Sequence, residues 1–310
     1  MNRQGAAPYE PLTPRLALGL AAPHTWPASV LPVLLGGVLA WVRDGKWDFV
    51  LFYCSLAAAV LMQSAVNTLN DYCDFVKETD RLDNSTDPED AVLIYHRLNP
   101  RQVCGLGFAF LAAAALPGLW VVYQRGVAPL VIGLLGGAVI VCYSFGKLPI
   151  SYLPLGELVS GVVMGGLIPL AVYDALTGCL CPQVLWSASP LILGIALIMF
   201  SNNLCDIERD LPAGRRTLPC LLGRPRALAL YRGLLVSMPV LVSLLASLYC
   251  PRSCALLPLF WMAGAPVLIR QLRLPMTPEV RERAMPGILA LNRRLILGYL
   301  ALILLHGSAG

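Results

Sequence analysis

A run of amide and carboxylate side chains closes one of the long apolar stretches of this chain. After the apolar residues 49–66, the polar run Asn67–Asp74 begins, and it continues through Lys77, Glu78 and Asp80. An apolar stretch of about twenty residues is typical of a membrane-spanning helix. The side chains that recur at helical spacing, and so share one face, are Asn67, Asn70 or Asp71, Asp74 and Glu78. Carboxylates at the end of a membrane helix are costly without a partner, and a hard divalent cation, which prefers oxygen ligands, is their natural partner.

A second run of the same kind closes another apolar stretch. It reads Asn202-Asn-Leu-Cys-Asp-Ile-Glu-Arg-Asp210, in which Asp206 and Asp210 are four residues apart and two asparagines, Asn202 and Asn203, come one turn earlier. We call residues 67–80 the first polar run and residues 202–210 the second polar run. Both are led by asparagine and both follow apolar stretches, so together they predict one oxygen-rich site.

The composition indicates an integral membrane protein. Of the 310 residues, 57% are hydrophobic and only 13% are charged, and the mean hydropathy is +0.68. A soluble domain carries about a quarter charged residues. We therefore predict an all-α, polytopic membrane protein surrounded by membrane lipid, and we expect no nucleic acid among its partners.

Nine apolar segments are the expected transmembrane helices. They are 15–42, 48–69, 102–123, 127–145, 153–176, 188–205, 227–250, 254–271 and 286–306. We predict that they form a single bundle, one domain over residues 15–310, preceded by a polar N-terminal segment at 1–14. Prolines at 23, 27 and 32 are expected to kink or break the first segment. Glycines between 156 and 166 are expected to allow close helix packing.

The distribution of Lys and Arg predicts the orientation in the membrane. If every segment crosses, 19 of the 23 basic residues fall on the side of the N-terminus, and the other side holds Arg43, Lys46, Arg125 and Arg252. The positive-inside rule then places the N-terminus in the cytoplasm and the C-terminus outside, in the cell (inner) membrane. The two polar runs follow the second and sixth segments, so both are predicted to lie at the cytoplasmic face, where they can meet.

An oxygen-rich site with cations around it is suited to Mg²⁺ bound together with a phosphorylated lipid. Mg²⁺ takes one or two carboxylates directly and completes its shell with water and phosphate oxygens. Arginine holds phosphate oxygens bidentately. We expect a diphosphate clamped at the membrane surface, with the lipid tail running into the apolar bundle. The basic residues near the two runs are Lys77, Lys147, Arg209, Arg215 and Arg216.

Other reactive or charged residues have a structural interpretation. We expect loop pairing or contact with anionic lipid headgroups for Arg224, Arg226, Arg281 and Arg283. The chain has ten cysteines, and a disulfide would be expected only in an oxidising compartment. The cysteines near two loops of one predicted face are Cys179, Cys181, Cys250 and Cys254.

The two runs resemble the two Asp-rich motifs of the UbiA superfamily of membrane prenyltransferases. The first resemblance lies in Asn70-Asp-Tyr-Cys-Asp74-Phe-Val-Lys-Glu-Thr-Asp80, and the second lies in the second polar run with Gly214-Arg-Arg-Thr-Leu218 after it. The second motif is most similar to the MenA branch, the 1,4-dihydroxy-2-naphthoate polyprenyltransferases of menaquinone synthesis, as are residues 143–147 and 155–157. The resemblance covers about residues 60–225, and nine helices is also the count of the superfamily.

This resemblance implies an enzyme that transfers a polyprenyl chain from prenyl diphosphate to an aromatic acceptor, with Mg²⁺ as cofactor. In the MenA branch the acceptor is 1,4-dihydroxy-2-naphthoate, which also loses its carboxylate. The implied catalytic residues are Asp74, Lys77, Asp206 and Asp210, and the implied metal ligands are Asn70, Asp74, Asp206 and Asp210. The residues implied to bind the diphosphate are Asn67, Asn70, Asp71, Asp80, Asn203, Lys147 and Arg216. The rings of Tyr72, Tyr143 and Tyr152 either shelter an allylic cation through their π faces or anchor the interface.

One stretch departs from the MenA branch. Asp87-Pro-Glu-Asp90 stands where the branch commonly has a Gly-Pro-Ser-Arg-like run, so acid replaces a basic residue, and Glu78 stands where the branch usually has glycine. The loss of this basic residue affects the expected binding of an acidic acceptor. Arg97, a few residues further on, is a candidate to replace the missing positive charge. Two alternatives stay open. One is a superfamily member that prenylates another ring or cyclises the prenyl chain, and the other is a cation-coupled transporter, whose site is more typical of the membrane midplane.

Overall fold

The chain folds into a bundle of long helices. The computed structural model describes residues 9–77 and 92–307. Within these ranges the only extended pairing is an isolated bridge between Glu10 and Leu98. The described residues contain nine helices that are long and apolar enough to cross a membrane. The prediction of an all-α, polytopic fold is therefore confirmed.

The spanning helices follow one another with short connections. Five of the spans are single helices in the first two thirds of the chain: α2 (Pro27–Asp44), α3 (Phe49–Val76), α5 (Pro100–Arg125), α6 (Val127–Ser144) and α9 (Val184–Cys205). A composite span between α6 and α9 consists of α7 (Gly156–Ser160), the π-helical turn η3 (Gly161–Leu167) and α8 (Ile168–Thr177). The last three are α12 (Arg224–Tyr249), η4 with α13 (Pro251–Leu256 and Leu257–Arg273) and η5 with α14 (Pro278–Val280 and Arg281–Gly307).

The remaining elements are short. They are α1 (Pro14–Leu20), η1 (Pro23–Thr25), α4 (Val92–Tyr95), η2 (Ile150–Tyr152), α10 (Ile207–Asp210) and α11 (Leu218–Leu222). The predicted break in the first apolar segment is confirmed, and it lies between Leu20 and Pro27. Pro23 begins the 3₁₀ turn η1, and Ala22 before it adopts a left-handed backbone with φ of 48°. Pro27 then occupies the first turn of α2, where a proline costs no hydrogen bond.

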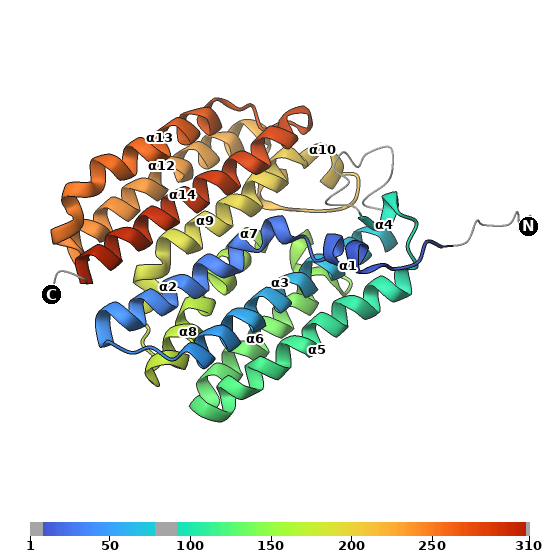
Figure 1. Ribbon diagram of the computed structural model, residues 1–310. Helices are drawn as coiled ribbons and strands as arrows, with labels where there is room; N and C mark the ends of the chain where they lie inside the picture. Colours follow the sequence, from blue (N-terminus) through green and yellow to red (C-terminus); the bar gives the residue numbers. More distant parts are fainter. Residues whose placement is uncertain (1–8, 78–91, 308–310) are drawn as a thin grey trace, which may run out of the picture.

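Two groups of helices form the two sides of the bundle (Figure 1). Helices α2, α3, α5 and α6 lie on one side, and α9, α12, α13 and α14 lie on the other. Helix α2 joins the two sides, because it packs against α3 and α8 as well as against α14. The short helices α1, α4 and α10 gather at one end of the bundle, the end at which α3 and α9 terminate. Large side chains such as Leu116, Tyr123 and Met262 are exposed on helices expected to face lipid, which is as apolar as they are.

Glycines bring the π-helical turn η3 very close to α9. An ideal Cβ on Gly165 would lie 2.5 Å from the backbone nitrogen of Ile192, and one on Gly161 would lie 2.5 Å from the carbonyl oxygen of Ile192. Backbone atoms cannot move aside as a flexible side chain can. The close packing expected at these glycines is therefore confirmed, and it fixes the position of α9, the helix that ends in the second polar run.

We predict that Gly165→Ala destabilises the folded protein. The new methyl group would collide with the α9 backbone, and overpacking of this kind costs about 1–3 kcal/mol. Gly233→Ala, on α12, is the matched control because an ideal Cβ there meets nothing within 4 Å. Thermal unfolding of the purified proteins in one detergent should show a melting temperature lowered by several degrees for Gly165→Ala alone. Equal melting temperatures for the two variants would contradict the packing described here.

Candidate active site

The described part of the first polar run, residues 67–77, and the second polar run lie at the end of the bundle that carries α1, α4 and α10 (Figure 1). Helix α3 continues through the first run as far as Val76, so Asn70 and Asp74 lie on its last turns. Helix α9 ends at Cys205, and the chain then turns into α10. Asp74 is 7% exposed, Asp206 is 4% exposed and Asp210 is fully buried. With Asp71, which is 7% exposed, the two helix ends therefore bring four buried carboxylates to the site.

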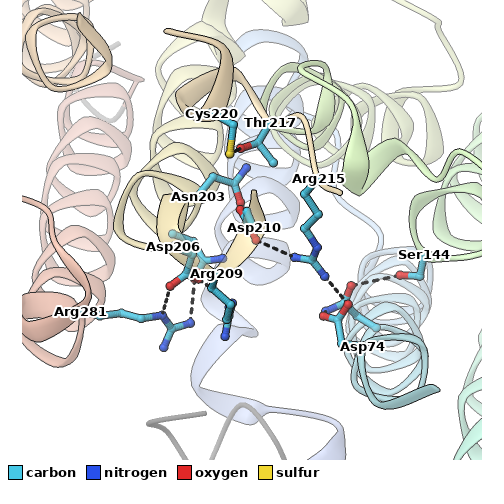
Figure 2. A network of polar contacts seen from close by, with 12 residues as sticks. Asp74, Ser144, Asn203, Asp206, Arg209, Asp210, Arg215, Thr217, Cys220 and Arg281 are labelled. Carbon is cyan, nitrogen blue, oxygen red and sulfur yellow. Dashed lines mark hydrogen bonds and ion pairs between the residues drawn. The ribbon is translucent and has the colours of Figure 1, made fainter. Parts of the chain in front are cut away.

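One guanidinium group contacts both polar runs. The side chain of Arg215 donates from Nη2 to Asp74 Oδ1, and its Nη1 lies 3.5 Å from Asp210 Oδ1. The Arg215 backbone N–H also donates to the Asp210 carbonyl, at 3.0 Å. Figure 2 shows Arg215 between the two carboxylates. The predicted meeting of the two runs is confirmed by this shared contact.

Two further arginines flank Asp206. Arg209 Nη2 donates to Asp206 Oδ2 at 2.7 Å, and Arg281 Nε lies 3.4 Å from Asp206 Oδ1. Arg281 also donates from Nη2 to Asn202 Oδ1, at 2.8 Å. Arg281 is the first residue of α14, so a third helix reaches the second polar run (Figure 2).

The first polar run is also linked to the end of α6. Asn70 Nδ2 donates to Asp74 Oδ2 at 2.9 Å, and Ser144 Oγ donates to Asn70 Oδ1 at 3.2 Å. Lys77 Nζ donates to the Ser144 carbonyl at 2.7 Å and lies 4.7 Å from the centre of the Tyr152 ring. These contacts orient Asn70 and Asp74 toward the second run and place the Lys77 ammonium at the rim of the site.

Three other predicted residues lie at the site in contacts that tie elements together. Asn67 Nδ2 donates to Thr25 Oγ1 at 2.8 Å and to the Ala21 carbonyl at 3.0 Å, which links α3 to the turn η1. Asp71 Oδ2 accepts from the Leu93 backbone N–H at 3.4 Å, which links α3 to α4. Asn203 Nδ2 donates to Glu157 Oε1 at 2.9 Å, which links α9 to α7.

The remaining predicted residues are not brought to the carboxylates. Lys147 and Arg216 are exposed, and the Arg216 backbone N–H donates to the Tyr152 carbonyl at 2.8 Å. Of the two adjacent arginines, Arg215 is the one that points into the site. Asp80, together with Glu78 and the acidic stretch at 87–90, lies outside the described residues.

A cavity of about 1030 Å³ opens beside the polar runs and extends among the helices. Its polar end is lined by Asn67, Asn70, Asp71, Asp74, Asn202, Asn203, Arg209, Arg215 and Arg281. The rest of its wall is mostly apolar and includes Ile132, Met164, Leu167 and Ile198. Asp206 and Asp210 are not among the lining residues, whereas the three arginines that contact them do line the cavity. One polar end and one long apolar wall suit a lipid with an anionic head.

The donor set of the site fits a hard divalent cation held together with a ligand. Among the described contacts, neither carboxylate oxygen of Asp210 accepts a hydrogen bond. Burial raises the pKa of Asp210 to about 7, because a buried carboxyl prefers to be neutral, although Arg215 opposes the shift. No three acidic, histidine or cysteine side chains of the described residues are grouped as a ready metal cage. The residues therefore fit Mg²⁺, which needs only one or two carboxylates and takes its other oxygens from water and phosphate.

Two site residues were missed by the sequence analysis. Arg281 was expected to pair in a loop or contact lipid, and its position 75 residues after Asp206 gives no signal that α14 starts beside the second run. Glu157 was noted only within the resemblance, yet it is 4% exposed and holds Asn203. An acid within an apolar segment is itself a signal of a buried partner, and that signal could have identified Glu157. By contrast, Arg224 pairs with Glu208 at 2.6 Å, in agreement with the expected loop pairing.

Comparison with known proteins identifies the same family that the two polar runs resemble. The UbiA prenyltransferase family matches residues 29–286. The 1,4-dihydroxy-2-naphthoate octaprenyltransferase of Bacillus subtilis is 34% identical over 72% of this chain and 71% of its own length. The protein of the same name from Mycobacterium tuberculosis is 33% identical over 80% of this chain and 84% of its own length. The structure of a UbiA homolog from Archaeoglobus fulgidus bound to DMAPP and Mg²⁺ has a TM-score of 0.61 at 16% identity, with 93% of this chain and 98% of that chain covered, which is a likeness of fold.

The family match covers nearly all of the spanning helices, from α2 to the start of α14. It includes both polar runs and the arginines between them. The nine apolar helices of the described residues agree with a multi-pass membrane protein. This chain therefore belongs to the UbiA prenyltransferase family, and it is a membrane prenyltransferase.

Proposed function

We propose that this enzyme transfers a polyprenyl chain from prenyl diphosphate to 1,4-dihydroxy-2-naphthoate, with Mg²⁺, as a step of menaquinone biosynthesis. The observation that carries this proposal is the meeting of two acidic helix ends at the polar end of one apolar cavity. The acceptor is taken from the names of the relatives in Bacillus subtilis and Mycobacterium tuberculosis. The class of donor, a prenyl diphosphate, and the cofactor are taken from the Archaeoglobus fulgidus homolog, which is bound to DMAPP and Mg²⁺.

The carboxylates and the amide of the two runs are the proposed Mg²⁺ ligands. Asn70 and Asp74 would hold Mg²⁺ from α3, and Asp206 and Asp210 would hold it from the second polar run, one or two of the carboxylates directly and the others through bound water. When bound, Mg²⁺ supplies positive charge where negative charge develops on the leaving diphosphate. Asn70, Asp74 and Asp206 are already hydrogen-bonded to neighbours, and Asp210 is ion-paired with Arg215 at 3.5 Å. A site positioned in advance loses little free energy to reorganisation when charge develops.

The arginines of the site are proposed to change partners when substrate binds. Arg215 and Arg209 neutralise Asp74, Asp210 and Asp206 in the structure described here. A cation that takes over those carboxylates would weaken their hold on the guanidinium groups, and both groups line the cavity. Guanidinium matches phosphate oxygens in a planar, bidentate geometry. We propose that Arg215 and Arg209 then hold the diphosphate, with Lys77 at the rim of the site.

The chemical step needs no oxidant or reductant. The bond between the allylic carbon and the diphosphate oxygen breaks, and its electron pair leaves with the diphosphate. The ring carbon that bears the carboxylate forms the new carbon–carbon bond, and loss of CO₂ from that carbon returns an electron pair to the ring. Tyr143 lines the cavity, and we propose that its ring shelters the cation-like carbon. Tyr152 lies under Lys77 and Arg215, at 4.7 and 5.2 Å, and holds these cations in place.

We propose that the site faces the cytoplasm. The excess of Lys and Arg on the side of the N-terminus indicates that the polar runs face the cytoplasm, where a charged acceptor and Mg²⁺ are available. Both runs lie at one end of the bundle, whereas transporters of the broken-helix kind bind near the midplane. This position favours an enzyme over a cation-coupled transporter.

We predict that Mg²⁺ with inorganic diphosphate stabilises the purified protein and that Asp206→Asn removes this effect. At a ligand concentration of 100 Kd, binding adds about 2.7 kcal/mol to the free energy of unfolding. Glu208→Gln is the matched control, because Glu208 is an exposed acid of α10 that pairs with Arg224. Melting curves with and without the two ligands should show the upward shift in the wild type and in Glu208→Gln. A shift of the same size in Asp206→Asn would exclude Asp206 as a ligand.

We also predict Mg²⁺-dependent turnover with farnesyl or geranylgeranyl diphosphate and 1,4-dihydroxy-2-naphthoate. Mass spectrometry should find a prenylated product that has lost CO₂. Asp74→Asn should lower turnover by at least about 100-fold while the protein stays folded, because a group that stabilises developing charge is worth that much. Release of diphosphate without this product would exclude 1,4-dihydroxy-2-naphthoate as the acceptor but would still agree with a prenyltransferase. Normal turnover in Asp74→Asn would exclude the proposed metal site.

A further inference from the structure

Arg281 is a cation of the cavity that the diphosphate site does not account for. It is the first residue of α14, it is 9% exposed, and it lines the same cavity as the two polar runs. A charged side chain in a membrane cavity is costly, and such residues are in general functional. Its neighbour Arg283, two residues along the chain, is exposed and does not line the cavity within the described structure.

The position of Arg281 separates it from the other two arginines. Arg215 lies between Asp74 and Asp210, where the two runs meet. Arg281 lies on the other side of Asp206, and Figure 2 shows Asp206 between Arg281 and the group formed by Arg215 and Asp74. A diphosphate held between the two runs would therefore contact Arg215 before it contacted Arg281.

The ion pair between Arg281 and Asp206 is one that a bound cation would weaken. Its Nε lies 3.4 Å from Asp206 Oδ1, which is a long contact, and its Nη2 donates to the neutral oxygen of Asn202 at 2.8 Å. A divalent cation on Asp206 would weaken the attraction between that carboxylate and Arg281. The guanidinium group lines the cavity, and its planar fork matches a carboxylate in two parallel hydrogen bonds.

The wall next to Arg281 suits an aromatic ring. Met285 and Leu289 follow it along α14 and line the same cavity, and Met199 and Ile198 line it from α9. Methionine makes favourable contacts with aromatic rings and adapts its shape to them. A ring whose carboxylate meets Arg281 would thus lie against apolar side chains.

We propose that Arg281 binds the carboxylate of an acidic aromatic acceptor and makes the enzyme select acidic acceptors over neutral ones. The inference rests on the proposed function and deepens it, because it assigns the acceptor subsite to the start of α14. A carboxylate in this cavity needs a cation close to it, since an unpaired buried charge is strongly disfavoured. Arg281 supplies that cation apart from the arginines proposed to hold the diphosphate.

The test measures binding of two ligands that differ only in a carboxylate. The affinities for 1-hydroxy-2-naphthoate and for 1-naphthol would be measured by isothermal titration calorimetry. The full-length protein would be in detergent, in the presence of Mg²⁺ and inorganic diphosphate. The variants are Arg281→Gln, Arg281→Lys and the control Arg283→Gln. We expect Arg281→Gln to weaken binding of the naphthoate by about 10- to 100-fold, the range for a hydrogen bond to a charged group. Binding of 1-naphthol should change by less than about 2-fold, Arg281→Lys should keep part of the affinity, and Arg283→Gln should keep all of it.

Three results would overturn the inference. The first is an equal loss of affinity for both ligands in Arg281→Gln, which would mean that Arg281 only supports the packing of the cavity. The second is loss of inorganic diphosphate binding instead of naphthoate binding, which would assign Arg281 to the diphosphate. The third is a wild type that binds the two ligands equally. Because these are binding measurements, they remain decisive even if turnover of 1,4-dihydroxy-2-naphthoate, measured separately, were to fail and the proposed function with it.

Discussion

Carboxylates buried at the end of a membrane bundle need positive charge beside them, and in this protein arginines supply it. Arg215 is shared by Asp74 and Asp210, while Arg209 and Arg281 lie on either side of Asp206. To break a buried ion pair by removing one partner costs roughly 3–5 kcal/mol. The ends of α3 and α9 and the start of α14 are thus held together by charge as well as by packing, and the polar end of the cavity exists because these pairs exist.

The same pairs explain how a site rich in acids can stay folded before it holds any cation. Three guanidinium groups line the cavity, and they contact Asp206 and Asp210, which are not among the lining residues. A divalent cation and a diphosphate bring opposite charges, so both can enter only if carboxylates and arginines exchange partners together. This coupling favours joint binding of the two, and it leaves the apolar remainder of the cavity to the lipid tail.

Much of this arrangement could be predicted from the sequence, because it depends on local patterns. Apolar length predicts the nine spans, and the even count of spans between the two runs predicts that Asp74 and Asp206 lie at the same end. The side-chain directions in the connection after α10 are not predictable in this way, since Arg215 and Arg216 differ by one residue and yet only Arg215 points to the carboxylates. The role of Arg281 depends on how α14 packs beside α9, and no spacing in the chain encodes that contact.

The central claim is that the two polar runs form one cation-dependent site, and a double-mutant cycle tests it most directly. The affinity for inorganic diphosphate in the presence of Mg²⁺ would be measured for Asp74→Asn, for Asp210→Asn and for the double variant. Residues that act on one bound ligand are strongly non-additive, whereas independent sites add within about 0.5 kcal/mol. We predict that the double variant loses little more affinity than the weaker-binding single variant. Losses that add in full would mean that α3 and the second polar run act separately, and would contradict the account.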